Sequence, residues 1–65
     1  MNRTRSLQVA IYWLSDRSYG GGKSVKDMRM AREIAARNAI LGYDKPGVSE
    51  IHIIETVLTV RKYEK

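Results

Sequence analysis

The 65-residue sequence contains no cysteine and a single histidine, His52. Disulfide bonds and thiolate metal sites are therefore excluded, and one imidazole cannot build a histidine cluster. We expect no metal site and no cofactor. No apolar run approaches the roughly 20 residues that a membrane-spanning helix needs, and the polar N-terminus has neither the signal-peptide nor the transit-peptide pattern. These absences predict a cytoplasmic protein without a membrane partner.

Arrangements for catalysis are missing too. The carboxylates Asp16, Asp44, Glu50 and Glu55 are scattered, and no two have a spacing that would place them on one rigid face for acid–base chemistry. No nucleophile is arranged with His52 and an acid. We expect His52 to lie on the surface or against a neighbouring strand. The sequence therefore predicts a protein that is not an enzyme.

The chain does contain enough apolar material for one small domain, residues 1–65. Hydrophobic residues make up 43% of it, which is typical of a globular chain, but at this length one core gives only modest stability. With disulfides and metal sites excluded, self-association is the remaining way to add stability, and we expect a homodimer. Twelve Lys and Arg against seven Asp and Glu give a net charge of +5. That balance attracts polyanions, although the dispersed bases are equally typical of a merely soluble surface.

A strand is predicted at residues 7–15, after a tail at residues 1–6 that we expect to be flexible. Apolar and other residues alternate there with period two. The parity expected to face the core consists of Leu7, Val9, Ile11 and Trp13. Tyr12, on the other parity, and Trp13 are the aromatic residues available for stacking on nucleic-acid bases.

Three glycines, Gly20, Gly21 and Gly22, precede Lys23 and resemble the end of a Walker A phosphate-binding loop. The full motif has a glycine where this chain has Arg17, and a nucleotide-hydrolysing domain needs far more chain. We therefore reject an NTPase site and favour a flexible connector. Two other interpretations stay open: a contact with a partner, or a phosphate site formed by N–H groups at a helix start together with Lys23 and Arg17.

A helix is predicted at residues 24–41. Ser24 is the expected N-cap, Asp27 favours the positive end of the helix dipole, and Gly42 suits the closing position. The alanine-rich apolar side would lie close on a sheet, opposite a basic side that Glu33 partly neutralises. The basic residues that are candidates for contacting phosphates or a partner are Lys26, Arg29, Arg32 and Arg37.

The last third, residues 48–63, consists almost entirely of strand-forming residues after a Pro-Gly turn. Its apolar face switches parity near Ile53 and Ile54, which requires a bulge, a bend or a tight reversal near Glu55. No Gly, Pro, Asn or Asp marks a hairpin, so we favour one long bent strand. The apolar residues expected to invite pairing with another chain are Val57, Leu58 and Val60.

These elements predict an α+β fold. A single helix would pack on a small sheet of two to three strands, in the order β-α-β with a long or divided last strand. If the strands on either side of the helix run parallel, the crossover should be right-handed.

The pattern Ala31-x-x-Ile34-Ala35 followed by Val48-x-x-Ile51-x-Ile53-Ile54-Glu55-Thr56 resembles small phage-encoded accessory proteins of the anti-CRISPR type. The similarity covers about half of the chain and contains no diagnostic motif. It implies a non-enzymatic inhibitor that binds a host nucleoprotein complex in the host cytoplasm and blocks its engagement of nucleic acid. No functional residue is carried over.

Three functions follow as hypotheses. The first is a protein-binding inhibitor or adaptor whose surface combines the glycine segment with the exposed helix edge near Met30, Ile40 and Leu41. The second is a direct nucleic-acid-binding protein that uses the basic helix face, although no recognition-motif signature is present. The third is a structural, self-assembling subunit.

Overall fold

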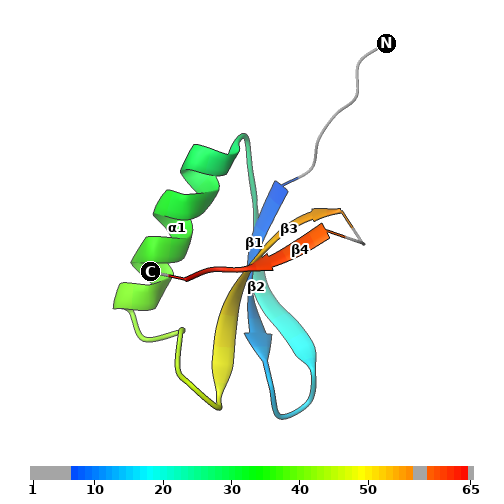
Figure 1. The fold of residues 1–65 in the computed structure, drawn as a ribbon, viewed down its shortest axis with the longest axis vertical. Coiled ribbons are helices and arrows are strands. Elements are labelled where there is room, and N and C mark those ends of the chain that lie inside the picture. Colours follow the sequence, from blue (N-terminus) through cyan, green and yellow to red (C-terminus); the bar gives the residue numbers. More distant parts are fainter. Residues whose placement is uncertain (1–6, 57–58, 65) are drawn as a thin grey trace.

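The structure is a computed structural model that describes residues 7–56 and 59–64. Within them the chain forms four strands and one helix (Figure 1). In chain order these are β1 (Leu7–Trp13), β2 (Ser18–Val25), α1 (Met28–Ile40), β3 (Ser49–Thr56) and β4 (Thr59–Lys62). The tail and the residues Val57 and Leu58 lie outside the described residues.

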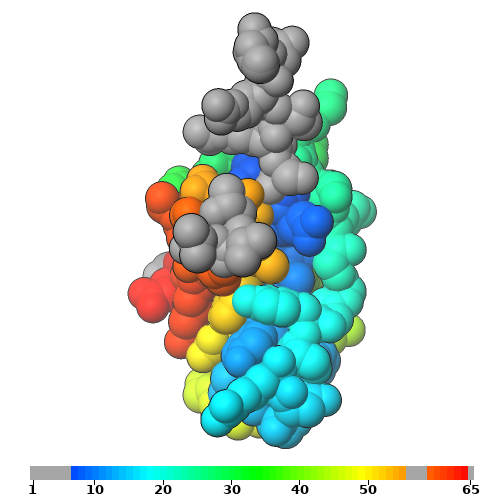
Figure 2. All heavy atoms as spheres, turned by 90° about the vertical axis from the view of Figure 1, so that its right-hand side faces the viewer, coloured from blue at the N-terminus to red at the C-terminus, as the bar shows by residue number. Residues whose placement is uncertain are grey.

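The four strands form one antiparallel sheet in the order β2-β1-β3-β4. Helix α1 covers one face of this sheet (Figure 1). In the described residues no helix covers the other face, which we call the open face (Figure 2). The predicted α+β class, with one helix on a small sheet, is confirmed. The sheet has four strands rather than two or three, and β1 and β3 are antiparallel, so the parallel crossover does not occur.

The additional strand next to β1 is the glycine segment, which we had interpreted as a connector. Leu7 pairs with Val25 and Gln8 with Ser24, and the pairing continues to Trp13 and Ser18 after a register shift between Val9 and Ile11. Three glycines disfavour a strand through backbone entropy. Pairing with β1 on both sides of the register shift offsets that cost, because each pairing satisfies backbone groups that a loop would leave to water. Gly20 pairs with Ile11, whereas Gly21 and Gly22 lie within the shift.

The helix consequently begins later than expected. Ser24 belongs to β2, and the N-cap is Asp27, whose carboxylate accepts a hydrogen bond of 2.9 Å from the Met30 N–H. Both residue types are favoured at this position, so the choice between them depends on where β2 ends. At the other end, the Gly42 N–H donates to the Ala39 carbonyl, with Gly42 in the left-handed conformation at φ +96°. The predicted closure at Gly42 is confirmed.

The predicted single bent strand at the end of the chain is wrong. Strands β3 and β4 run antiparallel, with Thr56 paired to Thr59, so the chain reverses between them. A register shift between Ile54 and Thr56 accompanies this reversal. The parity switch seen in the sequence therefore marks the approach to a hairpin whose connecting residues carry none of the usual turn signals.

The core lies between α1 and the sheet. The odd-numbered residues of β1 and β3 face it, as the alternation predicts, with Ile51 fully buried and Val9 1% exposed. Ala31 and Ala35 of α1 are also fully buried, because their small side chains let the helix approach the sheet closely. The buried hydrophobic residues are Leu7, Val9, Ala10, Ile11, Val25, Ala31, Ala35, Ile51 and Ile53.

Candidate functional site

Strand β2 is an edge strand, and it is where the glycine segment lies. Its only strand neighbour in the described part of the chain is β1. One side of its backbone is therefore unpaired within the sheet, which is the usual template for adding another strand. The β2 residues from Gly21 to Ser24 are exposed. The segment read as a mobile loop is thus an ordered, accessible sheet edge.

The glycines of β2 make room beside Trp13. A Cβ atom on Gly20 would lie 3.3 Å from the Trp13 indole nitrogen, so the ring occupies space that a side chain would take. Gly21 has φ +63°, a conformation that favours glycine, and open space surrounds its missing side chain. The absence of side chains at both positions opens the surface between β2 and α1.

A groove of about 350 Å³ occupies this space. We call it the β2 groove. Two aromatic rings, an isoleucine, an amide side chain and the glycine backbone form its walls: Ile11, Trp13, Gly20, Gly21, Asn38 and Tyr43. Its composition, apolar and aromatic with one polar amide, is typical of ligand and peptide sites.

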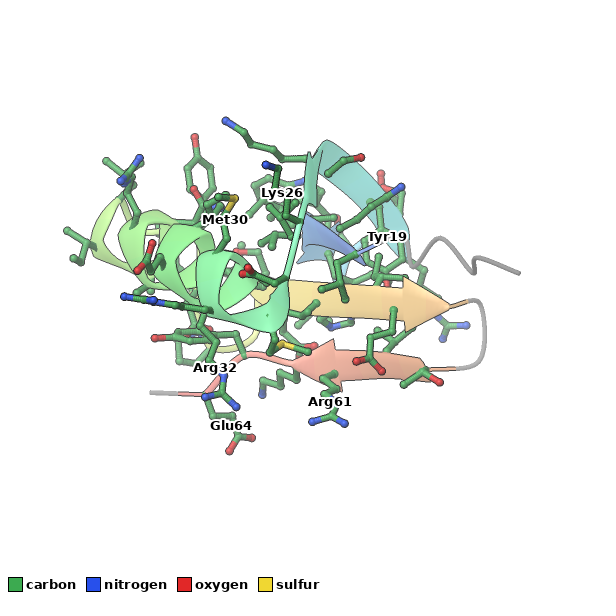
Figure 3. All side chains as sticks on the ribbon, turned by 90° about the horizontal axis from the view of Figure 1, so that it is seen from above. Tyr19, Lys26, Met30, Arg32, Arg61 and Glu64 are labelled. Carbon is green, nitrogen blue, oxygen red and sulfur yellow. The ribbon has the colours of Figure 1, made fainter. Side chains whose placement is uncertain are left out.

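Exposed apolar side chains lie on α1 and in the loop after it, and one of them, Tyr43, lines the β2 groove. Tyr43, which lines it, is 41% exposed, and Leu41, the C-cap residue, is 66% exposed. Met30 lies on the side of α1 that faces β2, near Lys26 (Figure 3). Ile40 is the most exposed of these residues, at 85%. Contiguous exposed apolar surface commonly marks a protein-binding site.

Three cations lie along β2 or at its ends, but they do not converge on one point. Arg17 lies in the turn before β2, with φ 54°, whereas Lys26 follows the strand next to the helix N-cap. An eight-residue strand is about 25 Å long, so Arg17 and the helix start are far apart. The interpretation left open above, a phosphate site of N–H groups at a helix start with Lys23 and Arg17, does not match this arrangement, because the glycines lie within β2.

The helical arginines do not form one continuous basic face. Arg29 is 3.8 Å from Glu33, and both side chains are largely exposed. Arg32 and Arg37 are five positions apart, which corresponds to about 140° around an α-helix. Arg32 accordingly lies on the β4 side of the molecule with Arg61 (Figure 3), while Arg37 faces elsewhere. Each charge can act only with the groups on its own side.

The β4 side has a second groove, of about 460 Å³, which we call the β4 groove. Arg32 from α1 and Arg61 from β4 line it together with Met28, Ile53 and Tyr63. Glu64 also lines it and supplies a carboxylate near the two guanidinium groups. Two such arginines have the chemistry to pair with an anionic group, for which the Glu64 carboxylate competes.

The open face carries a hydrogen-bonded network around His52. The Tyr19 hydroxyl lies 2.7 Å from Nδ1 of His52, and Nε2 of the same ring lies 2.8 Å from the Glu50 carboxylate. Lys62 is 3.6 Å from the other oxygen of Glu50. The Tyr12 ring stacks on the imidazole with centroids 4.8 Å apart and planes at 15°. The neutral imidazole satisfies both contacts if Nε2 donates to Glu50 and Nδ1 accepts from Tyr19.

This network places a hydroxyl, an imidazole and a carboxylate in the order found in catalytic triads. The charges around it do not activate the hydroxyl as a nucleophile. Burial raises the pKa of Tyr19, and the neighbouring Tyr12 and the negative charge of Glu50 raise it further. The hydrogen bond from His52 lowers the pKa of Glu50, and Lys62 adds to that effect against the opposing effect of burial. A neutral phenol on a flat sheet face is a weak nucleophile. The network is best suited to holding side chains of all four strands in fixed positions.

The two aromatic residues predicted for stacking lie on opposite sides of the sheet. Tyr12 is on the open face, where His52 and Tyr19 already contact its ring. Trp13 packs against the core on the helix side and lines the β2 groove. They cannot act together on one strand of nucleic acid.

Sequence reasoning missed the network because it depends on strand pairing. The expectation that His52 lies on the surface or against a neighbouring strand agrees with its position opposite Ala10 of β1, between Tyr19 and Glu50. The available signal was parity, since Tyr12 and His52 both alternate away from the core residues of their strands. Parity gives the face but not the register, and Tyr19 belongs to a strand that we had not predicted.

No family model, curated protein or solved structure matches this chain. Among the described residues, no helix is both long enough and apolar enough to cross a membrane. In that same part of the chain, no group of three or more His, Asp or Glu residues is placed to hold a metal ion. The arguments below therefore start from the geometry of the surfaces.

Proposed function

We propose that this chain is a small, basic, non-enzymatic binding protein that occludes a partner protein through the β2 side of the molecule. The surface consists of the β2 edge, the β2 groove and the apolar end of α1. It corresponds to the combination of glycine segment and exposed helix edge that the sequence suggested as a docking surface.

The observation that carries this proposal is the distribution of exposed apolar side chains. Seven large hydrophobic residues are exposed in the described part of the chain, and five of them lie on α1 or in the loop that follows it: Met30, Ile40, Leu41, Tyr43 and Val48. Such residues are often scattered singly over a surface. Their concentration on one element and the loop after it, with Tyr43 in an aromatic groove beside a sheet edge, is typical of a protein-binding surface.

The resemblance to anti-CRISPR-type phage proteins gives this proposal a narrower form. In that form the partner is a subunit of a host nucleoprotein complex, the protein acts in the host cytoplasm, and binding blocks access of nucleic acid to the complex. A net charge of +5 favours docking on an acidic surface of that complex.

Site-specific photo-crosslinking tests the proposal. A photoreactive phenylalanine analogue replaces Tyr43 in the β2 groove, and the protein is irradiated in cells that produce it. We expect a crosslink to one discrete protein that survives nuclease treatment. The matched control carries the same analogue at Val60, which is 42% exposed on β4. It should give no product with another protein, and only a crosslink to a second copy of this chain if β4 forms the homodimer.

Two outcomes would contradict the proposal. One is equal crosslinking from the β2 groove and from Val60, which would indicate contact without a defined surface. The other is a product that nuclease removes, which would indicate that nucleic acid is the partner. Leu41→Asp should weaken the specific crosslink, because a charge replaces exposed apolar surface at the rim of the groove without disturbing the core.

A second candidate function is direct binding of nucleic acid through the β4 groove. The observation in its favour is the convergence of Arg32 and Arg61 from different elements on one groove that also contains Tyr63. Arginine pairs with phosphate through two hydrogen bonds, and an aromatic ring beside it can stack on a base. The exposed Arg29 and Arg37 would contribute only long-range attraction.

Fluorescence anisotropy with a labelled single-stranded oligonucleotide tests this second function. We expect binding that weakens steeply as salt increases, because phosphate contacts release counterions. Arg61→Glu should weaken it more than Arg37→Glu, although both change the net charge by the same amount. No binding at low salt would remove this candidate.

The predicted homodimer is a further proposal, as is the structural, self-assembling subunit. Of the apolar residues expected at its interface, Val60 lies on the edge strand β4 and is exposed, whereas Val57 and Leu58 are outside the described residues. Size-exclusion chromatography with light scattering measures the mass directly. A monomer at tens of micromolar would contradict both.

A further inference from the structure

The β2 edge and the β2 groove lie next to each other, and together they define what kind of partner segment can bind. We propose that the partner contributes an extended, acidic peptide that adds as a fifth strand to the β2 edge and places an apolar side chain in the β2 groove. This inference rests on the proposed function and specifies the recognised segment.

The backbone of β2 supplies the first part of the argument. As the edge strand of an antiparallel sheet, it has unpaired N–H and C=O groups along one side in the described structure. Natural proteins usually protect such edges with proline, short strands, lysines, bulges or inward-pointing charges. Here the strand is eight residues long, contains no proline and is mostly exposed. Lys23 and the register shift at Gly21 and Gly22 protect only part of it. An extended peptide can therefore continue the ladder of hydrogen bonds.

The glycines supply the second part. Side chains of an added strand would point alternately to the helix side and to the open face. On the helix side, the β2 residue paired with Ile11 is Gly20, and Trp13 lies directly over it, 3.3 Å from where a Cβ would be. No side chain of Gly20 or Gly21 separates an added strand from the indole. An apolar side chain can therefore reach Trp13 and Tyr43 across the strand.

Charge identifies the peptide as acidic. From Arg17 to Lys26 the chain carries three cations and no carboxylate. Asp16 and Asp27 lie just beyond the two ends, and the Asp27 carboxylate is already engaged in capping α1. A second copy of this chain would bring its own lysines to the same edge and be repelled. A peptide with carboxylates is attracted to it.

The register makes the expected sequence more specific. Lys23 lies on the helix side of β2, since it pairs with the buried Val9, whereas Gly20 pairs with Ile11. Ile11 and Val9 are two residues apart on β1, and the register shift places an additional residue between their partners on β2. The peptide should therefore carry Asp or Glu two or three residues from its apolar anchor.

Selection from a library of random dodecapeptides displayed on a carrier tests the proposal on the intact protein. We expect enrichment of sequences with an apolar residue and an acidic residue at that spacing. Trp13 is the only tryptophan, so its fluorescence reports directly whether the groove is occupied. An enriched peptide should shift the Trp13 emission to shorter wavelength as it displaces water from the ring.

Backbone N-methylation of the enriched peptide separates strand addition from other modes. Methylating amides of one alternate set should weaken binding about tenfold each, because each removes a main-chain hydrogen bond and leaves an acceptor unpaired. Methylating the other set should have little effect. Lys23→Glu should weaken binding about tenfold, whereas the matched control Arg32→Glu, on the opposite side of α1, should change it less than about threefold.

Several results would overturn the inference. These are failure of the library to yield a binder, equal sensitivity to methylation at all positions, or equal effects of Lys23→Glu and Arg32→Glu. Slowed hydrogen exchange of β2 amides at high protein concentration without peptide would assign the edge to a second copy instead. Specific crosslinks from Tyr43 combined with any of these results would leave the proposed function standing. Crosslinks to nucleic acid alone would overturn the proposed function.

Discussion

We expect three different outcomes when each of the three consecutive glycines of β2 is replaced by alanine. Together the three variants test the backbone geometry of this edge strand. Replacing glycine by alanine where the backbone tolerates it stabilises a protein by about 0.4–1 kcal/mol, mainly by restricting the unfolded chain. A strained backbone conformation or a steric clash in the folded state reduces or reverses that gain. The net of this gain and this cost differs among the three glycines.

Gly22→Ala should stabilise the protein. Its φ is not in the left-handed region, and its Cβ would meet only the Gln8 amide oxygen at 3.8 Å, an ordinary contact. The full gain of about 0.4–1 kcal/mol should therefore appear. Gly21→Ala should destabilise it, because φ is +63° and an L-residue there costs about 1–2 kcal/mol. After the gain from the unfolded state is subtracted, the net loss is about 1 kcal/mol.

Gly20→Ala should act on the neighbouring indole. The added Cβ would lie 3.3 Å from the Trp13 nitrogen and 3.8 Å from its Cδ1, so the ring must move by a few tenths of an ångström. The strain offsets most of the entropic gain, and we expect a stability change smaller than about 0.5 kcal/mol. The Trp13 emission should nevertheless change in the folded state, since the ring lines an open groove.

Urea denaturation followed by circular dichroism and by Trp13 fluorescence measures all three effects. Thermal midpoints should differ by about 4–8 °C for each kcal/mol in a domain of this size. The order of stability should be Gly22→Ala, then Gly20→Ala, then Gly21→Ala. A Gly21→Ala protein as stable as Gly22→Ala would refute the described geometry, as would three equal losses, which are expected of a uniformly tight segment.

Three further substitutions test the cap, the core and the open face. Asp27→Ala should lower the free energy of unfolding by about 1 kcal/mol, because the Met30 N–H loses its acceptor; Asp27→Asn should retain most of it in the same urea titration. Ile51→Ala should cost about 2–5 kcal/mol out of a total of about 3–10 kcal/mol for 65 residues, and calorimetry should show a much lower midpoint or no transition. The fold lowers the pKa of Glu50 from 4.5, so its contribution to stability is present above that pH and is lost as the pH falls through the lowered pKa. Glu50→Gln should therefore lose stability less steeply in acid than the native chain, and parallel curves would show that the contact with His52 contributes nothing.

Several parts of the fold could be predicted from local sequence alone. The alternation of Leu7, Val9 and Ile11 gives both the strand and its buried face, since a period of two leaves no other arrangement for those side chains. The helix between Met28 and Ile40 follows from its periodicity, and Ala31 and Ala35 are buried as expected. These features depend on neighbours only a few residues away.

The errors occurred where two local signals compete or where none is present. Ser24 and Asp27 are both suitable caps, and the pairing of Ser24 with Gln8 on a distant strand decides between them. The intrinsic propensity of glycine indicates a loop, yet the segment that contains the glycines pairs with the edge of β1 and becomes a strand. The final hairpin has no turn signal, and only the pairing of β4 with β3 reveals it.

The candidate site shows the same division. The sequence pointed to the glycine segment and to the edge of the helix as separate features. It could not show that Gly20 lies under Trp13, or that Tyr43 closes the same groove, because these contacts join residues from different elements. It likewise grouped the helical arginines by type, whereas Arg32 lines the β4 groove together with Arg61.

The sequence by itself determined which residues are apolar enough to be buried, that one helix ends before Gly42, and that the net charge is positive. These properties depend on composition and short-range periodicity. Only the tertiary structure decided that the glycine segment is a sheet edge, that the last segment reverses, and that His52 joins Tyr19 to Glu50. The physical reason is that strand pairing is non-local: its hydrogen bonds form between segments whose register depends on the whole sheet, and the shape of every groove depends on that register.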